Sequence, residues 1–278
     1  MGKKYGVFLS VTALISIASV VIICISMGTT GWVYATAASV SGLTYGDSDV
    51  NHGLFTGSLT RQLVQTATNY DLYITCVWGS NACAWSCLST ASERTAEVES
   101  LLAGETPSFA CSVSTRALTS TGSAISRADN GTSTSDFLNA GAWLSNVIFM
   151  TLLLAAAAIS AGLSVVNSAW SPSESYLNVL GIYIANAVTV GLDVIVLIIW
   201  GVHYGVRTQT NVAIRDTIVG EFTSETSLGY SYWLLLTPPF LHAINIGLLY
   251  LRDTLINSEP PETKIDIEDI ADGTLVLF

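Results

Sequence analysis

YWLLLTPPFLHAINIGLLYL, residues 232–251, carries no charge and is long enough to cross the hydrocarbon core of a membrane, which takes roughly 20 residues. Three other stretches share this character, namely Val7–Met27, Ala142–Asn167 and Leu177–Trp200. These three contain one charged residue between them, Asp193. The sequence therefore predicts an all-α bundle of four transmembrane helices.

The composition of the whole chain agrees with a membrane protein. Half of the 278 residues are hydrophobic and only 11% are charged, and the mean hydropathy is +0.53. The net charge of −11 and the ten scattered basic residues argue against nucleic acid as a partner, because such binding needs Lys and Arg to neutralise phosphates. The expected partners are the lipid bilayer and other membrane proteins.

Four spans place both ends of the chain on one side of the membrane, and we expect that side to be the cytoplasm of a plasma-membrane protein. Lys3-Lys4 precede the first span and Arg252 follows the last, as the positive-inside rule favours. Four cysteines and the sequon at Asn130 lie in the first long loop, which suits the extracellular space. The expected segments are residues 1–6 (cytoplasmic), 7–27 (first span), 28–141 (extracellular), 142–167 (second span), 168–176 (cytoplasmic), 177–200 (third span), 201–231 (extracellular), 232–251 (fourth span) and 252–278 (acidic cytoplasmic tail).

The first apolar run has an alternative interpretation as a cleaved signal peptide, because Lys3-Lys4 precede it and Ala35-Thr36-Ala37 follows it. Its apolar core is too long for a typical signal peptide, and the Ala-x-Ala sequence lies well past the end of that core. We therefore expect the run to be retained as a membrane span.

The cysteines of the first loop, Cys76, Cys83, Cys87 and Cys111, are even in number and suggest two disulfides. CVWGSNAC, residues 76–83, is typical of a β-hairpin in which Gly79-Ser80 form a type II′ turn and Cys76 faces Cys83. A cross-strand disulfide there would leave Cys87 and Cys111 as the second bridge, with other pairings open. A zinc site is the alternative use of these cysteines, but Cys-x-x-Cys spacing and a nearby histidine are missing.

The same loop should hold a small antiparallel β-sheet. Residues 32–45 are rich in β-forming residues, and residues 70–78 alternate like a half-buried strand. Thr90 and Glu93 form a capping box that predicts a short helix after the hairpin. The second loop, residues 201–229, could add a strand to the sheet or extend a helix.

Two segments are expected to lack a packed core. Residues 106–135 are dense in Ser and Thr, so we expect a mobile loop glycosylated at Asn130. The tail from Arg252 has seven acidic residues against two basic ones and should be disordered. It ends with apolar Val276 and Phe278, a spacing typical of ligands of PDZ scaffold domains.

Polar residues inside the spans are candidates for function, because an isolated carboxylate within a membrane is costly. Asp193 lies in the middle of the third span and His242 lies at a similar counted depth in the fourth, with Asn245 one turn further. We predict a hydrogen bond between Asp193 and His242 that offsets the cost of burying both. Its role would be structural, with a proton or ion path as the alternative.

Small residues and prolines should shape the packing of the spans. The second span contains the small residues Ala155–Ala158, Ser160, Ala161, Gly162 and Ser164, and the third contains Ala187 and Gly191. Such residues let helices approach closely. We expect them to pack inside the bundle, with a lateral partner interface as the alternative. Thr237-Pro238-Pro239 should kink the fourth span.

Enzymatic activity is not expected. The sequence lacks Gly-x-Ser-x-Gly, His-Glu-x-x-His, P-loop and Gly-x-Gly-x-x-Gly motifs, and its three histidines are dispersed. No combination of a nucleophile and a base is apparent. We therefore expect no catalytic residue, no metal and no cofactor.

The layout resembles the claudin-like tetraspan superfamily, and within it the residues look most like a clarin. MGTTGWV, residues 27–33, resembles the Gly-Thr-x-x-Trp exit from a clarin's first span, and HGLFTG, residues 52–57, resembles the clarin Gly-Leu-Phe-x-Gly. The last span is similar in the spacing of Trp233, His242, Asn245, Gly247, Leu248 and Leu249. The longer first loop and Asp193 depart from the clarin pattern. These departures fit a divergent member of the family, of invertebrate type.

The resemblance implies a four-helix bundle topped by an antiparallel extracellular sheet, with Trp32, Gly53, Leu54 and Phe55 as structural signatures. Gly53-Leu54-Phe55 is expected to be a strand of that sheet. Clarins are linked to sensory cells, where they support mechanotransduction complexes and synaptic organisation. This chain would act in the same way as an accessory or scaffolding subunit that holds a membrane partner, a channel or mechanosensory complex, while its tail contacts a PDZ or cytoskeletal scaffold. The alternatives are a claudin-type junction protein and a channel subunit that uses Asp193 and His242.

Overall fold

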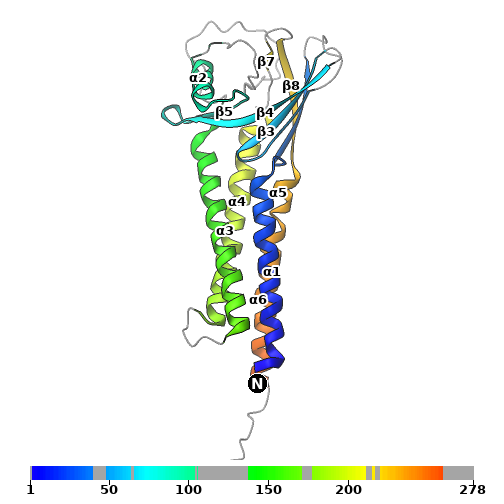
Figure 1. Cartoon of the computed structure of the whole chain (residues 1–278), viewed down its shortest axis with the longest axis vertical. Helices are drawn as coiled ribbons and strands as arrows, with labels where there is room; N and C mark the ends of the chain where they lie inside the picture. The colour runs from blue at the N-terminus through cyan, green and yellow to red at the C-terminus, as the bar shows by residue number, and fades with distance from the viewer. Residues whose placement is uncertain are drawn as a thin grey trace, which may run out of the picture.

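The computed structural model describes residues 2–39, 48–63, 66–103, 105, 137–170, 177–210, 215–216 and 220–258. Four of its helices are long and apolar enough to cross a membrane. They form an elongated bundle that carries an antiparallel β-sheet at one end (Figure 1). The beginning of the chain and the end of the last helix both lie at the opposite end (Figure 1).

The bundle consists of α1 (Gly2–Gly28), α3 (Ala140–Ala169), α4 (Val179–Val206) and the pair α5 (Tyr230–Leu234) and α6 (Thr237–Ser258). Helix α1 packs against α3 and α6, and α4 packs against the same two helices, so the four helices form a ring. Each of the four helical segments extends beyond its expected span at one end or both. Helix α4 runs past Trp200, and α6 includes residues 252–258, which we expected to be disordered.

The proline pair interrupts the last span, as expected. Helix α5 ends at Leu234, and α6 begins at Thr237 with Pro238 and Pro239 in its first turn. Proline is tolerated there because the first amides of a helix have no intrahelical acceptor. The prolines therefore divide the span into a short helix next to the sheet and a long helix below it.

The sheet draws strands from both loops. Its strands are β1 (Val33–Ser39), β2 (Ser48–His52), β3 (Thr56–Leu63), β4 (Thr66–Val77), β5 (Ala82–Ser86), β6 (Leu138–Asn139), β7 (Arg215–Asp216) and β8 (Gly220–Leu228). They are ordered β6-β5-β4-β3-β2-β1-β8-β7, and every pair is antiparallel. Strand β8 pairs with β1 along seven residues, from Val33 opposite Leu228 to Ser39 opposite Phe222. The second loop thus contributes strands β7 and β8, and its first residues extend helix α4.

The β4–β5 hairpin has the expected register with a different turn. Cys76 faces Cys83, and the two form the predicted disulfide. The turn is a 3₁₀ segment (Trp78–Ser80) followed by Asn81 at φ 50°, rather than a type II′ turn at Gly79-Ser80. Asparagine tolerates this left-handed conformation, and its side-chain oxygen accepts the Gly141 N–H at 2.8 Å. Asn81 therefore joins the hairpin to the start of α3.

Helix α2 (Ala91–Leu102) follows the hairpin and packs on β4 and β5. The capping box predicted from Thr90 and Glu93 is formed. Val98 of this helix is fully buried against Ala82, Ala84 and Phe137. Cys87 is also disulfide-bonded. Cys111, the partner that we predicted for it, lies outside the described residues, as do Asn130, Val276 and Phe278.

Gly53-Leu54-Phe55 forms the turn between β2 and β3, and the expectation of a strand there is wrong. The Gly53 N–H donates to the Thr56 carbonyl at 2.8 Å and closes the turn. A Cβ on Gly53 would lie 2.2 Å from the Thr29 carbonyl oxygen, so only glycine fits against the end of α1. Leu54 is buried at the top of the bundle, and Phe55 is exposed.

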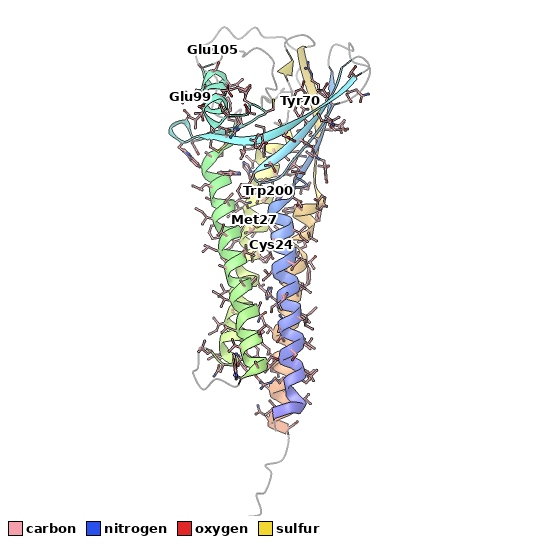
Figure 2. The ribbon with its side chains drawn as sticks, in the orientation of Figure 1. Cys24, Met27, Tyr70, Glu99, Glu105 and Trp200 are labelled. Atoms are coloured by element: carbon pink, nitrogen blue, oxygen red, sulfur yellow. A yellow bond between two sulfur atoms is a disulfide. The ribbon has the colours of Figure 1, made fainter. Side chains whose placement is uncertain are left out.

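Trp32 connects the first span to the sheet. Its indole N–H donates to the Ser26 carbonyl at 2.7 Å, and its ring lies 4.7 Å from that of Trp200. Its carbonyl accepts the Gly229 N–H at 2.8 Å, and this hydrogen bond links Trp32 to the residue before α5. We call Ser26, Trp32, Gly53 and Gly229 the neck. Trp200 and Met27 both lie near this level (Figure 2).

Candidate functional site

The inner faces of all four spans carry polar side chains that meet in one layer of the bundle. The layer contains Ser16 and Ser19 from α1, Ser160 from α3, Asn186 from α4, and His242 and Asn245 from α6, all fully buried. Buried polar groups cost free energy unless they form hydrogen bonds. We refer to these six residues as the polar layer, and their bonds determine what the site can do.

His242 is held by hydrogen bonds on both sides of its ring. Its Nδ1 lies 2.6 Å from the Asn186 side-chain oxygen, and its Nε2 lies 2.8 Å from the Ser19 hydroxyl. The Asn186 amide nitrogen donates to the carbonyl of Ile182, so the oxygen of that amide faces the histidine. Nδ1–H therefore donates to Asn186, and Nε2 accepts the Ser19 hydroxyl. These bonds tie α1, α4 and α6 together.

Asn245 completes the layer one turn further along α6. Its amide nitrogen donates to the Ser16 hydroxyl oxygen at 2.9 Å and approaches the Asn186 oxygen at 3.3 Å. The Ser16 hydroxyl lies 3.4 Å from that of Ser160 on α3. All four spans thus belong to one connected network. Its groups are satisfied mainly by one another, as expected of a structural core.

The predicted hydrogen bond between Asp193 and His242 is not formed. Asp193 is fully buried, and neither of its carboxyl oxygens has a hydrogen-bond partner among the described residues. Asp193 lies seven residues after Asn186 on α4, which is about 10 Å along the helix axis. Counting residues from the expected ends of the spans wrongly places Asp193 and His242 at the same depth. The count fails because α4 continues to Val206 and a turn separates α5 from α6.

An apolar layer closes the bundle between the polar layer and the sheet. It contains Ile23, Met150, Leu153, Val196 and Leu235, all fully buried in one cluster. Asp193 lies one turn from Val196, at the boundary between the two layers. Tight apolar packing leaves no partners for ions or water. In the part of the chain that the structure describes, the polar network therefore ends below the neck.

The small residues of the spans divide between the inside and the outside of the bundle. Ala157, Ser160, Ala161 and Ser164 of α3 are buried, as expected. Ala158 and Gly162, however, face outward on α3, so the expectation that they pack inside is wrong. Ala187 and Gly191 on α4 face outward too, as do Ala243 and Gly247 on α6. We call Ala158/Gly162, Ala187/Gly191 and Ala243/Gly247 the outward small pairs.

The outward small pairs lie near the level of the polar layer. Gly162 is two residues from Ser160, Ala187 adjoins Asn186, and Gly247 is two residues from Asn245. A Cβ added at any of the three glycines would meet nothing within 4 Å. These glycines therefore have no packing role within the described chain, although small residues at this spacing let a second helix approach closely.

Aromatic side chains surround the sheet-side ends of the spans. The Phe55 and Trp78 rings lie 6.3 and 6.4 Å from the ring of Trp143, whose indole N–H donates to the Leu54 carbonyl. Trp233, a residue of the clarin-like pattern, is exposed on α5. Tryptophan and tyrosine are enriched at membrane interfaces. Phe55, Trp78 and Trp233 thus expose aromatic rings near the sheet-side ends of the long apolar helices.

Reasoning from the sequence overlooked Asn186, Ser16 and Ser19, although a signal was present. Thr12, Ser16, Ser19 and Ser26 recur at helical spacing on one face of α1, as do Asn186, Thr189 and Asp193 on α4. All seven side chains are buried. Polar residues that repeat along one face of a span predict the interior of a bundle. The sequence assigned no role to His52 and His203, and both are buried.

The described residues contain no group of three or more His, Cys, Asp or Glu side chains that could hold a metal ion. The chemistry available in the polar layer is hydrogen bonding between neutral amide, hydroxyl and imidazole groups. Its geometry fastens the four helices to one another. No family model and no curated protein matches the chain.

Proposed function

We propose that this chain is a non-enzymatic, four-pass protein of the plasma membrane that acts as an accessory or scaffolding subunit of a membrane complex. In this proposal the sheet is extracellular and both termini are cytoplasmic, as Lys3-Lys4, Arg252 and the sequon at Asn130 favour. The clarin resemblance suggests a mechanosensory or synaptic complex as the setting. Enzymatic deglycosylation that shifts the mass of the wild-type chain but not of Asn130→Gln would test the orientation.

The outward small pairs are the observation that carries this proposal. Three helices present glycine to the outside at about the same level, with open space above each one. Glycine lowers helix stability relative to other residues, so its repeated use on outward faces calls for a compensating role. Close approach of a partner's transmembrane helix is the role that small residues at this spacing serve in membranes.

The interior of the bundle supports an accessory role over a conducting one. The groups of the polar layer bond chiefly to each other, and Ile23, Leu153 and Val196 close the bundle above them. An ion pathway needs polar groups or water along its whole length. A channel subunit that conducts through Asp193 and His242 would have to open this apolar layer.

Co-purification from native membranes in a mild detergent tests the proposal. Gly162→Leu, Gly191→Leu and Gly247→Leu each block one outward small pair. Each has a matched control that introduces the same residue at an exposed position of the same helix, namely Ile159→Leu, Ile195→Leu and Ile244→Leu. We expect one or more glycine variants to lose an integral membrane protein that the wild type and the matched control retain.

Other outcomes would overturn the proposal. If all six variants recover the same proteins as the wild type, the outward small pairs bind no partner. Recovery of the chain only with its own copies, together with continuous strands at cell–cell contacts, would favour a claudin-type junction protein. A pH-dependent current that disappears in Asp193→Asn would favour a channel subunit.

Deleting Phe278 tests the proposed PDZ scaffold contact, because capture of PDZ proteins should then be lost.

A further inference from the structure

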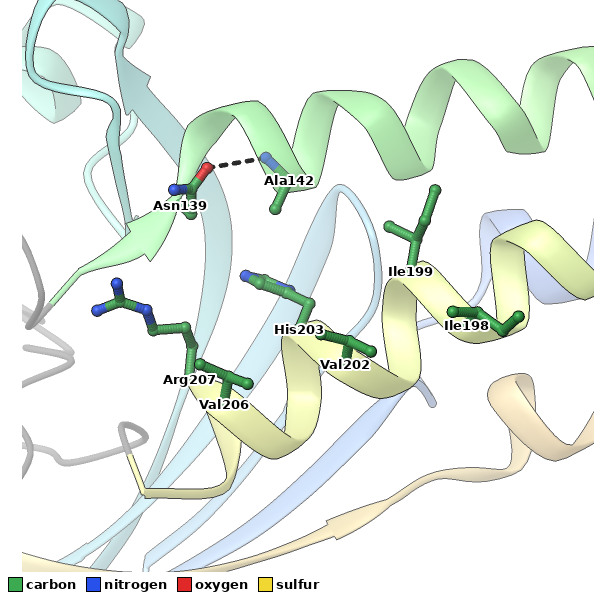
Figure 3. Close-up of a pocket in the computed structure, with 8 residues that line it drawn as sticks. All are labelled: Asn139, Ala142, Ile198, Ile199, Val202, His203, Val206 and Arg207. Atoms are coloured by element: carbon green, nitrogen blue, oxygen red, sulfur yellow. Dashed lines mark hydrogen bonds between the residues drawn. The ribbon is translucent and has the colours of Figure 1, made fainter.

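A groove of about 440 Å³ opens between the sheet-side ends of α3 and α4 (Figure 3). This volume lies within the range of roughly 300–1,000 Å³ typical of small-molecule sites. The groove starts at Ile198 on α4 and ends near Arg207, directly after that helix. It therefore spans the level at which a membrane-spanning helix passes from hydrocarbon to headgroups.

The lower part of the groove is apolar and faces outward. Ile198, Val202 and Val206 line it, and their side chains are 58, 60 and 66% exposed. They follow one another at a spacing of four residues, so they form a continuous ridge along the outer face of α4. A bundle within a membrane presents such a ridge to acyl chains.

The upper part of the groove is polar and basic. Asn139, His203 and Arg207 line this end, and none of the lining residues is acidic. The His203 side chain is 7% exposed, and neither of its ring nitrogens has a hydrogen-bond partner among the described residues. In Figure 3 the imidazole points away from the backbone of α4 toward the side where Asn139 lies. A buried imidazole without a partner costs free energy, which a bound polar group would offset.

We propose that this groove binds one phospholipid of the sheet-side leaflet. One acyl chain lies along Ile198, Val202 and Val206, and the phosphate contacts the Arg207 guanidinium. His203 donates a hydrogen bond to a headgroup oxygen. The order of apolar and basic residues along α4 matches the order of tail and phosphate in such a lipid. A guanidinium is well suited to phosphate because it can donate two parallel hydrogen bonds. This inference does not depend on the proposed accessory role.

The test uses the full-length chain in a mild detergent and counts bound lipid by native mass spectrometry. The probe is dioleoyl-phosphatidylglycerol, and a diacylglycerol with the same chains lacks the phosphate. Val202→Trp fills the groove, and Val194→Trp places the same side chain at an exposed position of α4 outside it. Arg207→Gln removes the charge, and Arg252→Gln removes an arginine near the end of α6. Both tryptophan variants should fold, because the replaced side chains are exposed.

We expect the wild type, Val194→Trp and Arg252→Gln to hold one phosphatidylglycerol. Val202→Trp should hold none, and Arg207→Gln should bind about tenfold more weakly because a charge-assisted hydrogen bond is lost. Equal retention by Val202→Trp and Val194→Trp would overturn the proposal. So would equally tight binding of the diacylglycerol, or displacement of the lipid by inorganic phosphate. Loss of a co-purifying protein in Val202→Trp without loss of lipid would assign the groove to a partner helix instead.

Discussion

Gly53 and Gly229 lie in the neck, where an added Cβ would approach a backbone carbonyl oxygen to 2.2 Å. Gly162, Gly191 and Gly247 face outward from the bundle, where an added Cβ would meet nothing within 4 Å. The same residue type therefore serves opposite purposes in the two regions. In the neck glycine lets two segments of this chain touch, whereas on the outer faces it leaves a surface that the described chain does not use.

This difference separates the residues that maintain the fold from those that are free to serve a partner. The neck holds the end of α1, the β2–β3 turn and the start of α5 within hydrogen-bonding distance. Larger side chains there must displace backbone, which is costly in a packed region. On the outer faces, larger side chains extend into open space. Substitutions in the two regions should therefore differ strongly in their effect on stability.

Gly53→Ala should produce the largest loss. The new methyl group would lie 2.2 Å from the Thr29 carbonyl oxygen, so the β2–β3 turn or the end of α1 must move. We expect the free energy of unfolding in detergent to fall by about 3 kcal/mol, the upper end of the usual cost of overpacking. Thermal unfolding followed by circular dichroism measures the loss. Gly247→Ala is the control and should not be destabilised, since alanine favours helix over glycine. Equal stability of the two variants would contradict the contrast between the regions.

His52 should make the sheet side of the molecule sensitive to acid. Burial beside Trp85 lowers the pKa of His52 to about 4, and the nearby His203 adds to this effect. In the unfolded chain the pKa of His52 is about 6.5. The fold is therefore not penalised by protonation of His52 above that pH, and its stability decreases as the pH falls from about 6.5 toward 4. The loss over this window should be about 3 kcal/mol.

The measurement compares the stability of the wild type and His52→Phe from pH 7 to pH 4. Phenylalanine keeps an aromatic ring at the position of His52, whose ring lies 4.7 Å from that of Trp85, and removes the titrating group. The difference between the two curves isolates His52 from other groups that titrate. Parallel curves would show that protonation of His52 does not destabilise the fold.

The architecture was largely predictable because it depends on local patterns. Long uncharged runs gave the four spans, the capping box of Thr90 and Glu93 gave α2, and the strand alternation brought Cys76 opposite Cys83. Gly53-Leu54-Phe55 was misjudged because the strand was inferred from its position after Trp32 and from the clarin resemblance, not from a local pattern. The decisive constraint is the approach of Thr29, which is distant in sequence.

The contacts inside the bundle were less predictable. Which polar groups meet depends on how far α4 and α6 are shifted along each other. A shift of two turns changes the partner of His242 from Asp193 to Asn186. That level is set by the continuation of α4 to Val206 and by the break before Pro238. Inward and outward faces of a uniformly apolar helix are also hard to distinguish. For this reason Ala158 and Gly162 were assigned to the wrong side.

His242→Leu should have an intermediate effect, because it removes bonds that this chain satisfies internally. The Ser19 hydroxyl and the Asn186 oxygen would each lose the partner that His242 provides. We expect a loss of about 1–2 kcal/mol, the size of interhelical hydrogen bonds in membrane bundles. Asp193→Asn is the comparison and should cost less and preserve surface delivery, since its carboxyl group makes no hydrogen bond in the described chain. If Asp193→Asn proved the more damaging change, the carboxylate itself would be structural.

Gly162→Leu should have the smallest effect on the isolated protein, a change in the free energy of unfolding within about 0.5 kcal/mol. The leucine side chain begins in open space, and leucine is at least as compatible with a helix as glycine. Thermal unfolding of the purified chain in detergent provides the value. A clear loss of stability would mean that residues outside the described part of the chain cover this face, and the contrast with Gly53 would weaken. Unchanged stability together with a lost partner would place the role of Gly162 outside the fold of this chain.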